Sequence, residues 1–509
     1  MPDATARVSL GFVDVHAAFG PDPGTAAAAG TSLASLVEAR EAHGIRLSLA
    51  SSLLAISADG SSGNRLAAEA AAEPANGLAA IAVIGPHRTG DVQRRLDEAE
   101  RSGAVGYRLA GWDGSAPPPA AIGEVLGAVA RSGRPLLVKL ERTGAASQIG
   151  AATAELGIPV VLLGAHYTHI VDDLAAAARY PHLHLETSAL AHFRAIETAV
   201  RTIGPERLLL GTGSPGRAAG SPIGAILAST IAADAKRLIL GGNAVRLFGL
   251  PDGPIDLPAL APPERAFDVH SHFGPLDFDV PQVPDGDLLP ALRVAPIQAA
   301  VASAAVAIFG DQVRGNDQAV RAVAGSADTR ELGAYIVADP TDLPTTVQQL
   351  RRYLGAPGVF GVKVHGEWSG TPTGSRAMSD LFGQLAGFGR PVKIHNAGAG
   401  WDEALGTLAR RHPRLPIVIA HGGLGTPSVE GARLAAAHDN VYVEFSSSFA
   451  HLPTVRQAAA IAGPERLLWG SDGPLLEPAF VMGTYRDAGL RSEDLDRVFW
   501  TNATGLFGW

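Results

Sequence analysis

The stretch FVDVHAAFGPD at residues 12–22 recurs, with few changes, as FDVHSHFGPLD at residues 267–277. Two further pairs of segments match in the same order: GPERLLLGTGSP at residues 204–215 with GPERLLWGSDGP at 463–474, and NAVRLFG at 243–249 with NATGLFG at 502–508. The separation between matched residues drifts only from 252, for Asn64 and Asn316, to 259 for the GPER segments. Ordered matches at a nearly constant separation indicate a tandem duplication. The repeated unit has about 250 residues, the length of one (β/α)8 barrel.

The composition excludes several functional classes. The chain has 41 Lys and Arg against 50 Asp and Glu, a net charge of −9, whereas a nucleic-acid-binding protein is typically basic. It has no cysteine, so disulfides, thiolate metal sites and a cysteine nucleophile are excluded. Any metal must therefore be held by His, Asp or Glu. We expect a partner that is a small molecule and not a nucleic acid.

The sequence shows no export or membrane segment. Residues 1–10, MPDATARVSL, contain Asp3 and lack a basic start followed by an apolar run. The most apolar run, residues 299–309, is far shorter than the roughly 18 residues that a membrane-spanning helix needs. We expect a soluble cytoplasmic protein with no membrane partner.

Short apolar runs that end in Gly, Asp, Asn or His alternate with stretches of helical length. In the second unit the runs are residues 266–270, 297–309, 332–338, 360–365, 391–395, 416–421, 441–445 and 466–472. This alternation is typical of buried parallel strands with crossover helices. The first unit contains the same number of runs, among them residues 45–56. Eight strands in each unit predict an α/β fold with two tandem (β/α)8 TIM-like barrels.

Five prolines mark the boundary between the two units. They lie between residues 251 and 263, where they block regular structure and favour an extended linker. The predicted domains are residues 1–250, a linker at 251–264, and residues 265–509.

Histidines and one aspartate lie at the ends of the second unit's predicted strands. Residues i and i+2 of an extended segment point the same way, so His270 and His272 can converge on one ion. The other strands end in His365, His395, His421 and Asp472. Because a (β/α)8 barrel carries its chemistry at the carboxyl ends of its strands, this pattern predicts a metal-dependent active site.

The ordered set DVHSHFG, strand-5 His, AHGG, WGSDGP and a closing Asn-Ala resembles the amidohydrolase superfamily. It is most similar to the amidohydrolase-related branch, which contains metal-dependent hydrolases and non-oxidative decarboxylases of the aminocarboxymuconate-semialdehyde and γ-resorcylate type. The resemblance implies that one divalent metal is held by His270, His272, His395 and Asp472. It also implies that His421 acts as an acid or base or polarises the substrate. Zinc suits N/O ligation and hydrolytic chemistry, and manganese is the alternative.

Further residues are expected around the pocket. They are His365, Glu367, Trp368, Asn396 and Glu444. For Trp368 and Glu444, ordinary packing or a salt bridge is an equal alternative. Lys363 and Lys393 are expected to point away from the mouth, either toward the helices or into a deeper layer of the barrel.

Three functions fit this pattern. The first is hydrolysis of a small ester, lactone or amide by metal-activated water, with Asp472 accepting a proton and His421 assisting. The alternative is non-oxidative decarboxylation of a small carboxylic acid, for which Arg314 is a candidate to bind the carboxylate. The third is a non-catalytic binding or scaffold protein, which fits the first unit better than the second.

The first unit lacks most of the predicted ligands. His16 stands opposite His270, but the remaining positions are Ala18 opposite His272, Ala110 opposite His365, Lys139 opposite His395, Gly164 opposite His421 and Gly213 opposite Asp472. We therefore expect this barrel to bind no catalytic metal and to pack on the second barrel as a pseudo-dimer partner.

The duplication provides a matched pair of substitutions. His270→Ala should abolish activity and metal content, because it removes a predicted ligand, whereas His16→Ala should leave both nearly unchanged. Metal analysis and an activity assay of the two purified variants test this expectation. Retention of the metal by His270→Ala would contradict the assignment.

Overall fold

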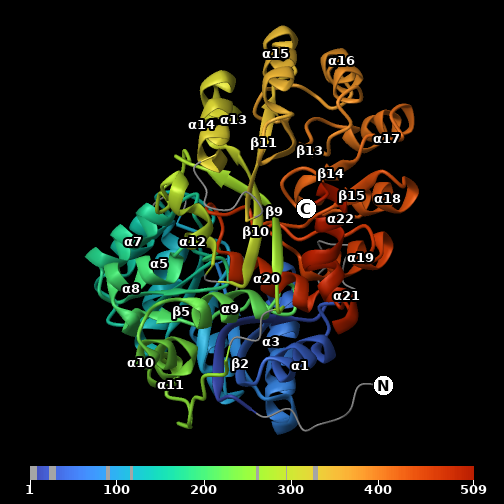
Figure 1. Ribbon diagram of the computed structural model, residues 1–509. Coiled ribbons are helices and arrows are strands. Elements are labelled where there is room, and N and C mark those ends of the chain that lie inside the picture. The colour runs from blue at the N-terminus through green and yellow to red at the C-terminus, as the bar shows by residue number, and fades with distance from the viewer. Residues whose placement is uncertain are drawn as a thin grey trace. The chain divides into compact units, whose positions relative to one another are not determined.

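The computed structural model of the chain describes residues 9–21, 30–86, 92–114, 118–259, 263–293, 295–324 and 331–509. Contacts divide the chain into two compact units, Met1–Leu260 and Ala261–Trp509. In each unit parallel strands alternate with helices along the chain (Figure 1). The described residues of the predicted linker form no helix or strand.

The first unit has eight parallel strands that pair in sequence order. They are β1 (Phe12–Phe19), β2 (Ile45–Ser52), β3 (Leu78–Ile84), β4 (Gly106–Leu109), β5 (Leu136–Lys139), β6 (Val160–Leu163), β7 (Leu183–Glu186) and β8 (Leu208–Leu209). The sheet closes because the segment around β8 hydrogen-bonds to β1. The Val15 amide donates to the Leu210 carbonyl at 2.9 Å, and the Ala18 amide to the Ser214 carbonyl at 3.0 Å. This unit is a (β/α)8 barrel.

The second unit has seven parallel strands, again in sequence order. They are β9 (Ala266–Phe273), β10 (Ile297–Ala304), β11 (Leu332–Ala338), β12 (Val359–His365), β13 (Val392–His395), β14 (Ile417–Ile419) and β15 (Val441–Val443). The predicted eighth strand, residues 466–472, is not a regular strand. It still closes the barrel: the Leu468 amide donates to Val443, and the Val269 amide donates to Trp469. The segment is irregular because Asp472 has a φ of 61°, which no regular strand allows.

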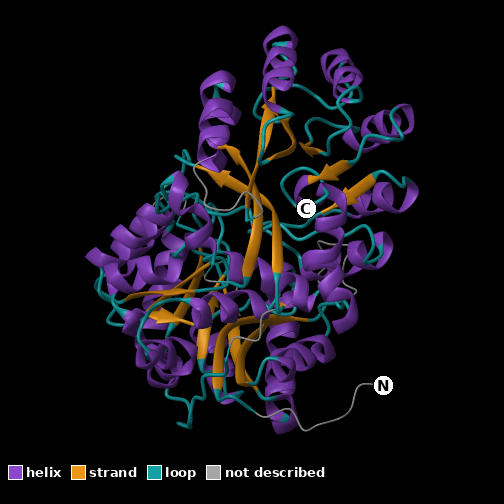
Figure 2. Ribbon diagram, viewed as in Figure 1, coloured by secondary structure: helices purple, strands orange, loops and turns teal. Residues whose placement is uncertain are grey.

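Helices follow the strands in both units and lie outside them (Figure 2). In the first unit they are α1 (Leu33–Ala42), α2 (Leu53–Ser57), α3 (Gly60–Ala72), α4 (Val92–Arg101), α5 (Ala120–Ser132), α6 (Ala145–Thr153), α7 (Ile170–Arg179), α8 (Ala195–Ile203), α9 (Gly220–Ala228), α10 (Ala233–Arg237) and α11 (Asn243–Phe248). In the second they are α12 (Leu288–Leu292), α13 (Ala305–Phe309), α14 (Gln312–Ala324), α15 (Leu343–Tyr353), α16 (Arg376–Leu385), α17 (Trp401–Arg411), α18 (Val429–Ala437), α19 (Leu452–Ala462), α20 (Pro478–Asp487), α21 (Ser492–Asp496) and α22 (Asn502–Phe507). Among the described residues, no helix combines the length and the apolar character needed to cross a membrane.

Two predicted strands were too long. Residues 45–56 form β2 followed by α2, and residues 297–309 form β10 followed by α13. A short apolar run does not distinguish a buried strand from a buried helix, which explains the error. The same break occurs at the same place in both units, as the duplication requires.

The last helix of each unit packs against the amino-terminal ends of the strands. In the second unit, Phe507 of α22 lies 5.7 Å from Phe267 between ring centroids, and Trp509 lies 4.5 Å from it. In the first unit, Ala244 and Phe248 of α11 join the buried strand residues in the same way. This packing closes one end of each barrel and leaves the carboxyl ends of the strands for a site.

An asparagine at the start of each final helix anchors it to the eighth strand position. Asn243 Nδ2 donates to the Pro205 and Leu208 carbonyls, and Asn502 Nδ2 donates to those of Pro464 and Leu467, all within 2.8 Å.

Substitution of either asparagine tests this anchor. Asn243→Ala and Asn502→Ala should each lower the free energy of unfolding by about 1–3 kcal/mol, because two carbonyls lose their donor. Urea denaturation is the measurement, and Gln348→Ala on the exposed face of α15 is the control, expected within about 0.5 kcal/mol of the parent. Losses no larger than the control's would show that water replaces the amide.

Candidate metal centre and active site

Three predicted ligands converge at the carboxyl ends of the strands in the second unit. His270 and His272 come from β9, and Asp472 follows the closing segment. The Asp472 Oδ1 atom lies 3.4 Å from His270 Nε2 and 3.0 Å from His272 Nε2. Their ligand atoms lie within 4.8 Å of one another, and all three residues are buried. This spacing suits a single divalent ion.

The Nδ1 atom of each histidine contacts a neighbouring residue. The Nδ1 of His270 lies 2.8 Å from Glu444 Oε1, and that of His272 lies 3.1 Å from Ser303 Oγ. Such contacts set the ring orientation and leave Nε2 for the metal, as in most histidine metal sites. The donor set therefore fits the divalent metal that the sequence predicts.

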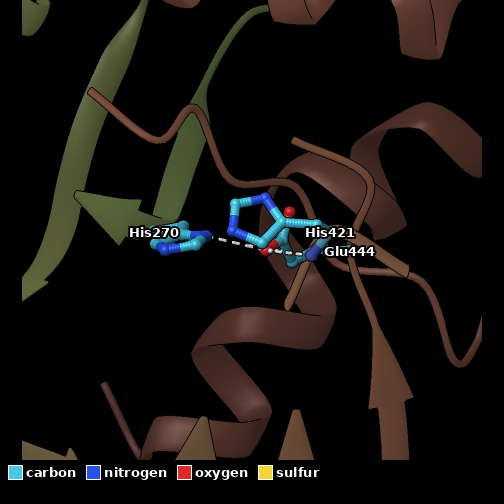
Figure 3. Close-up of side chains that lie close together, drawn as sticks. All are labelled: His270, His421 and Glu444. Carbon is cyan, nitrogen blue, oxygen red and sulfur yellow. Dashed lines mark hydrogen bonds and ion pairs between the residues drawn. The ribbon is translucent and has the colours of Figure 1, made fainter. Parts of the chain in front are cut away.

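Glu444 connects four segments of the barrel. Its carboxylate, which is fully buried, accepts hydrogen bonds from His270 Nδ1, Lys393 Nζ, and the amides of His421 and Ser446, at 2.6–3.0 Å. Figure 3 shows Glu444 beside His270 and His421. These three residues also meet the spacing for a metal group. The hydrogen bonds to Glu444 orient the His270 ring and hold the backbone at His421.

Two buried lysines lie one layer below the ligands. Lys393 Nζ is 3.0 Å from Glu444 Oε1, and Lys363 Nζ is 3.0 Å from His270 Nε2. Of the two predicted orientations, the deeper layer of the barrel is correct. Burial, with the nearby charge of Lys393, lowers the pKa of Lys363 to about 7. The Lys363 amine contacts the same Nε2 atom of His270 that would bind a metal.

His395 lies close to these residues but outside the ligand group. Its ring centroid is 4.8 Å from that of His421 and 4.1 Å from that of His365, on which it stacks. Its Nε2 atom is 2.9 Å from Glu367 Oε2. Its role as a fourth ligand stays a prediction, because in this arrangement the nitrogen faces a carboxylate.

His421 has a defined tautomer. Its Nδ1 atom lies 2.6 Å from the Ser446 carbonyl, which can only accept, so Nδ1 carries the proton. Burial lowers the pKa of His421 to about 4, so the ring is neutral at pH 7 and Nε2 has a free lone pair. Both His421 and Asp472 have positive φ, 58° and 61°, unusual for residues other than glycine. Strained backbone of this kind concentrates at functional sites.

A cavity of about 450 Å³ lies next to His365. Its lining includes His365, Trp368, Phe309 and Val313, and the rings of Trp368 and Phe309 lie 4.6 Å apart. Trp368 is 49% exposed, so it forms a wall of the pocket and not part of the core. Asn396 is fully buried, and its Oδ1 atom accepts a hydrogen bond from Thr373 at 3.3 Å.

The structure does not support a substrate contact for Arg314. This residue is exposed on α14 and lines a different cavity, with Arg293, Gln318 and Arg321. The buried face of α14 contains Gly315, Asn316, Ala319 and Val323 instead. The helical period therefore directs Arg314 away from the strand ends, which the linear sequence did not reveal.

Sequence reasoning also underrated Glu444 and missed Ser303 and Ser446. The duplication could have indicated two of them, Glu444 and Ser446. Glu186 and Ser188 of the first unit stand opposite Glu444 and Ser446, and the glutamate and serine persist where the ligands are lost.

Comparison with known proteins identifies the family. A family model described as "Amidohydrolase" matches residues 13–250 and again residues 267–509. The chain belongs to the amidohydrolase family. No curated protein matches this amidohydrolase-family chain.

Solved structures similar to this amidohydrolase-family protein cover about half of it. One is a 2,6-dihydroxybenzoate decarboxylase in complex with 2,6-dihydroxybenzoate, at 17% identity over 49% of this chain and 100% of that chain, with a TM-score of 0.37. A 5-carboxyvanillate decarboxylase from Sphingomonas paucimobilis has 15% identity over 48% and 99%, with a TM-score of 0.38. A dihydroxybenzoic acid decarboxylase from Polaromonas, with bound manganese, has 15% identity over 48% and 97%, with a TM-score of 0.36.

The two units provide a matched test of the positioning role of Glu444. Glu444→Gln should weaken metal binding by about 10- to 100-fold, because His270 loses the carboxylate that orients it. Glu186→Gln, at the corresponding position of the first unit, should leave metal affinity unchanged. Metal titration with circular dichroism as a check of folding measures both. Equal effects of the two substitutions would assign Glu444 a purely structural role.

Proposed function

We propose that the second barrel is a divalent-metal-dependent enzyme that removes the carboxylate of a small acid with an aromatic or otherwise apolar body as CO2. The observation that carries this proposal is a cavity with an aromatic wall that is also lined by His365, whose ring stacks on that of His395. Small-molecule sites typically combine an apolar lining with a few convergent polar groups. Zinc and manganese both suit the ligands, with zinc favoured by N/O ligation.

The first set of residues in this proposal would bind the metal. His270, His272 and Asp472 would hold the metal, with His395 as the predicted fourth ligand. A bound divalent ion would supply the positive charge that draws the substrate carboxylate to this end of the pocket.

Trp368 and Phe309 would hold the apolar body of the substrate. Three aspartates, Asp311, Asp339 and Asp342, line the same cavity and would repel a carboxylate from that end. The substrate would therefore enter with its carboxylate toward His365.

Decarboxylation also consumes a proton, because the carboxylate leaves as CO2 and the carbon that bore it gains hydrogen. The contact between His395 and Glu367 offers a route for this proton. The Glu367 side chain is 65% exposed, whereas that of His395 is 10% exposed, so the pair connects solvent to the buried cluster.

Hydrolysis of an ester or lactone is the second candidate, and the tautomer of His421 favours it. An unprotonated Nε2 on a neutral ring suits removal of a proton from water. The same nitrogen could then return that proton to the leaving group.

Product analysis separates the two reactions. The metal-loaded protein should release CO2 from a panel of aromatic and enoic carboxylic acids, and a chelator or His270→Ala should remove this activity. Acid release from lactones in a pH-stat, without CO2 from any acid, would establish hydrolysis. Neither product from a protein that binds metal would favour the non-catalytic class.

The aromatic wall has its own test. Trp368→Ala should raise KM about tenfold with a smaller change in kcat, because the lost contact of about 1.4 kcal/mol acts on binding. Val171→Ala, an exposed apolar position in α7, is the control. An unchanged KM for Trp368→Ala would place the substrate elsewhere.

A further inference from the structure

The first barrel keeps the buried glutamate and the hydrogen bonds to it that are found in the second barrel's site. His16 Nδ1 lies 3.2 Å from Glu186 Oε1, as His270 lies beside Glu444. The Gly164 and Ser188 amides donate to Glu186, each at 2.6 Å, as the His421 and Ser446 amides donate to Glu444. A buried, hydrogen-bonded carboxylate thus persists in a barrel that has lost most of the predicted ligands.

The charges around this carboxylate differ between the units. Position 137, opposite Lys393, is a leucine, so Glu186 has no lysine partner there. Arg108 of β4 occupies the position of Lys363, two residues before Ala110 as Lys363 is two residues before His365. The neighbouring Tyr107 hydroxyl bonds Glu100 of α4, outside the sheet. Because side chains alternate along a strand, Arg108 points into the barrel.

Arg108 is 91% buried and forms no hydrogen bond or ion pair with the residues that the structure describes. Burial lowers its pKa to about 10, and only the charge of Glu186 opposes this shift. Glu186 forms no ion pair with Arg108 in the described part of the chain; its carboxylate instead accepts hydrogen bonds from His16, Gly164 and Ser188. A buried guanidinium with no partner is costly and is normally matched by an anion.

A second guanidinium lies where the lost ligand would be. Gly213, opposite Asp472, has a φ of 68°, close to the 61° of Asp472. A Cβ atom added at Gly213 would lie 2.7 Å from Cδ of Arg217. Arg217 therefore fills the space of the missing aspartate side chain. The nearby His166 and His192 are neutral at pH 7, because burial lowers their pKa to about 3 and about 4.

From this geometry we propose that the first barrel binds a small organic carboxylate at its strand ends, without a metal, through the guanidinium of Arg108. Because the Arg108 guanidinium has no ion-pair partner among the described residues, a bound anion would neutralise it. The planar, forked guanidinium matches a carboxylate with two parallel hydrogen bonds. This site is independent of the reaction proposed for the second barrel.

Binding measurements on the full-length chain test the proposal. The His270→Ala protein, whose second-barrel site is disabled, is titrated by calorimetry with benzoate and, separately, with inorganic phosphate. Saturable binding of benzoate that Arg108→Leu weakens at least tenfold, while Lys139→Gln leaves it unchanged, is the expected result. Lys139 is the matched control because it is a cation at the same rim, exposed and paired with Glu141. Absence of benzoate binding, or binding of phosphate alone, would overturn the carboxylate site.

The stability of Arg108→Leu gives a second readout that a structural role would not produce. Without ligand, this variant should melt at a higher temperature than its parent, because an unpaired buried charge is replaced by an apolar side chain of similar volume. The combination of weaker binding and higher thermal stability supports a ligand-binding arginine. A lower melting temperature with unchanged benzoate affinity would show that Arg108 serves the fold alone.

Discussion

The buried carboxylate of Glu444 is the constraint on which the second barrel's site depends. A fully buried charge is tolerated only where hydrogen bonds and an opposite charge satisfy it. Glu444 meets this need with groups from four places in the chain: the side chains of His270 and Lys393 and the amides of His421 and Ser446. Each of these hydrogen bonds also fixes the position of a segment at the strand ends. Although burial raises it, the charge of Lys393 and the two backbone hydrogen bonds hold the pKa of Glu444 below its usual value. The same carboxylate orients His270.

The two barrels show what can change around such a carboxylate. Glu186 keeps its bonds to His16 and to two backbone amides, so this hydrogen-bond pattern is the same in both units. The positively charged side chains near the carboxylate differ between the two units: Arg108 and Leu137 stand at the positions of Lys363 and Lys393. In addition, Arg217 packs over Gly213, which stands at the position of Asp472.

Much of the architecture could be predicted from the sequence, because repetition and strand–helix alternation are properties of the chain itself. The convergence of His270 and His272 followed from the two-residue period of a strand. Other features depend on bends that no periodic pattern encodes. The closing segment is irregular at Asp472, and two apolar runs end as helices α2 and α13. Arg314 was predicted to bind the substrate carboxylate, but it lies on the exposed face of α14 and lines another cavity.

The sequence by itself determined the duplication, the parallel α/β architecture and the identity of the residues at the strand ends, since all of these arise from local order along the chain. Only the tertiary structure decided which of those residues meet. It joined Asp472 to His270 and His272 and directed the His395 nitrogen to Glu367. It also left Arg108 buried without a partner among the described residues. These outcomes depend on distances between segments that are far apart in the chain, and such distances are set when the barrel closes.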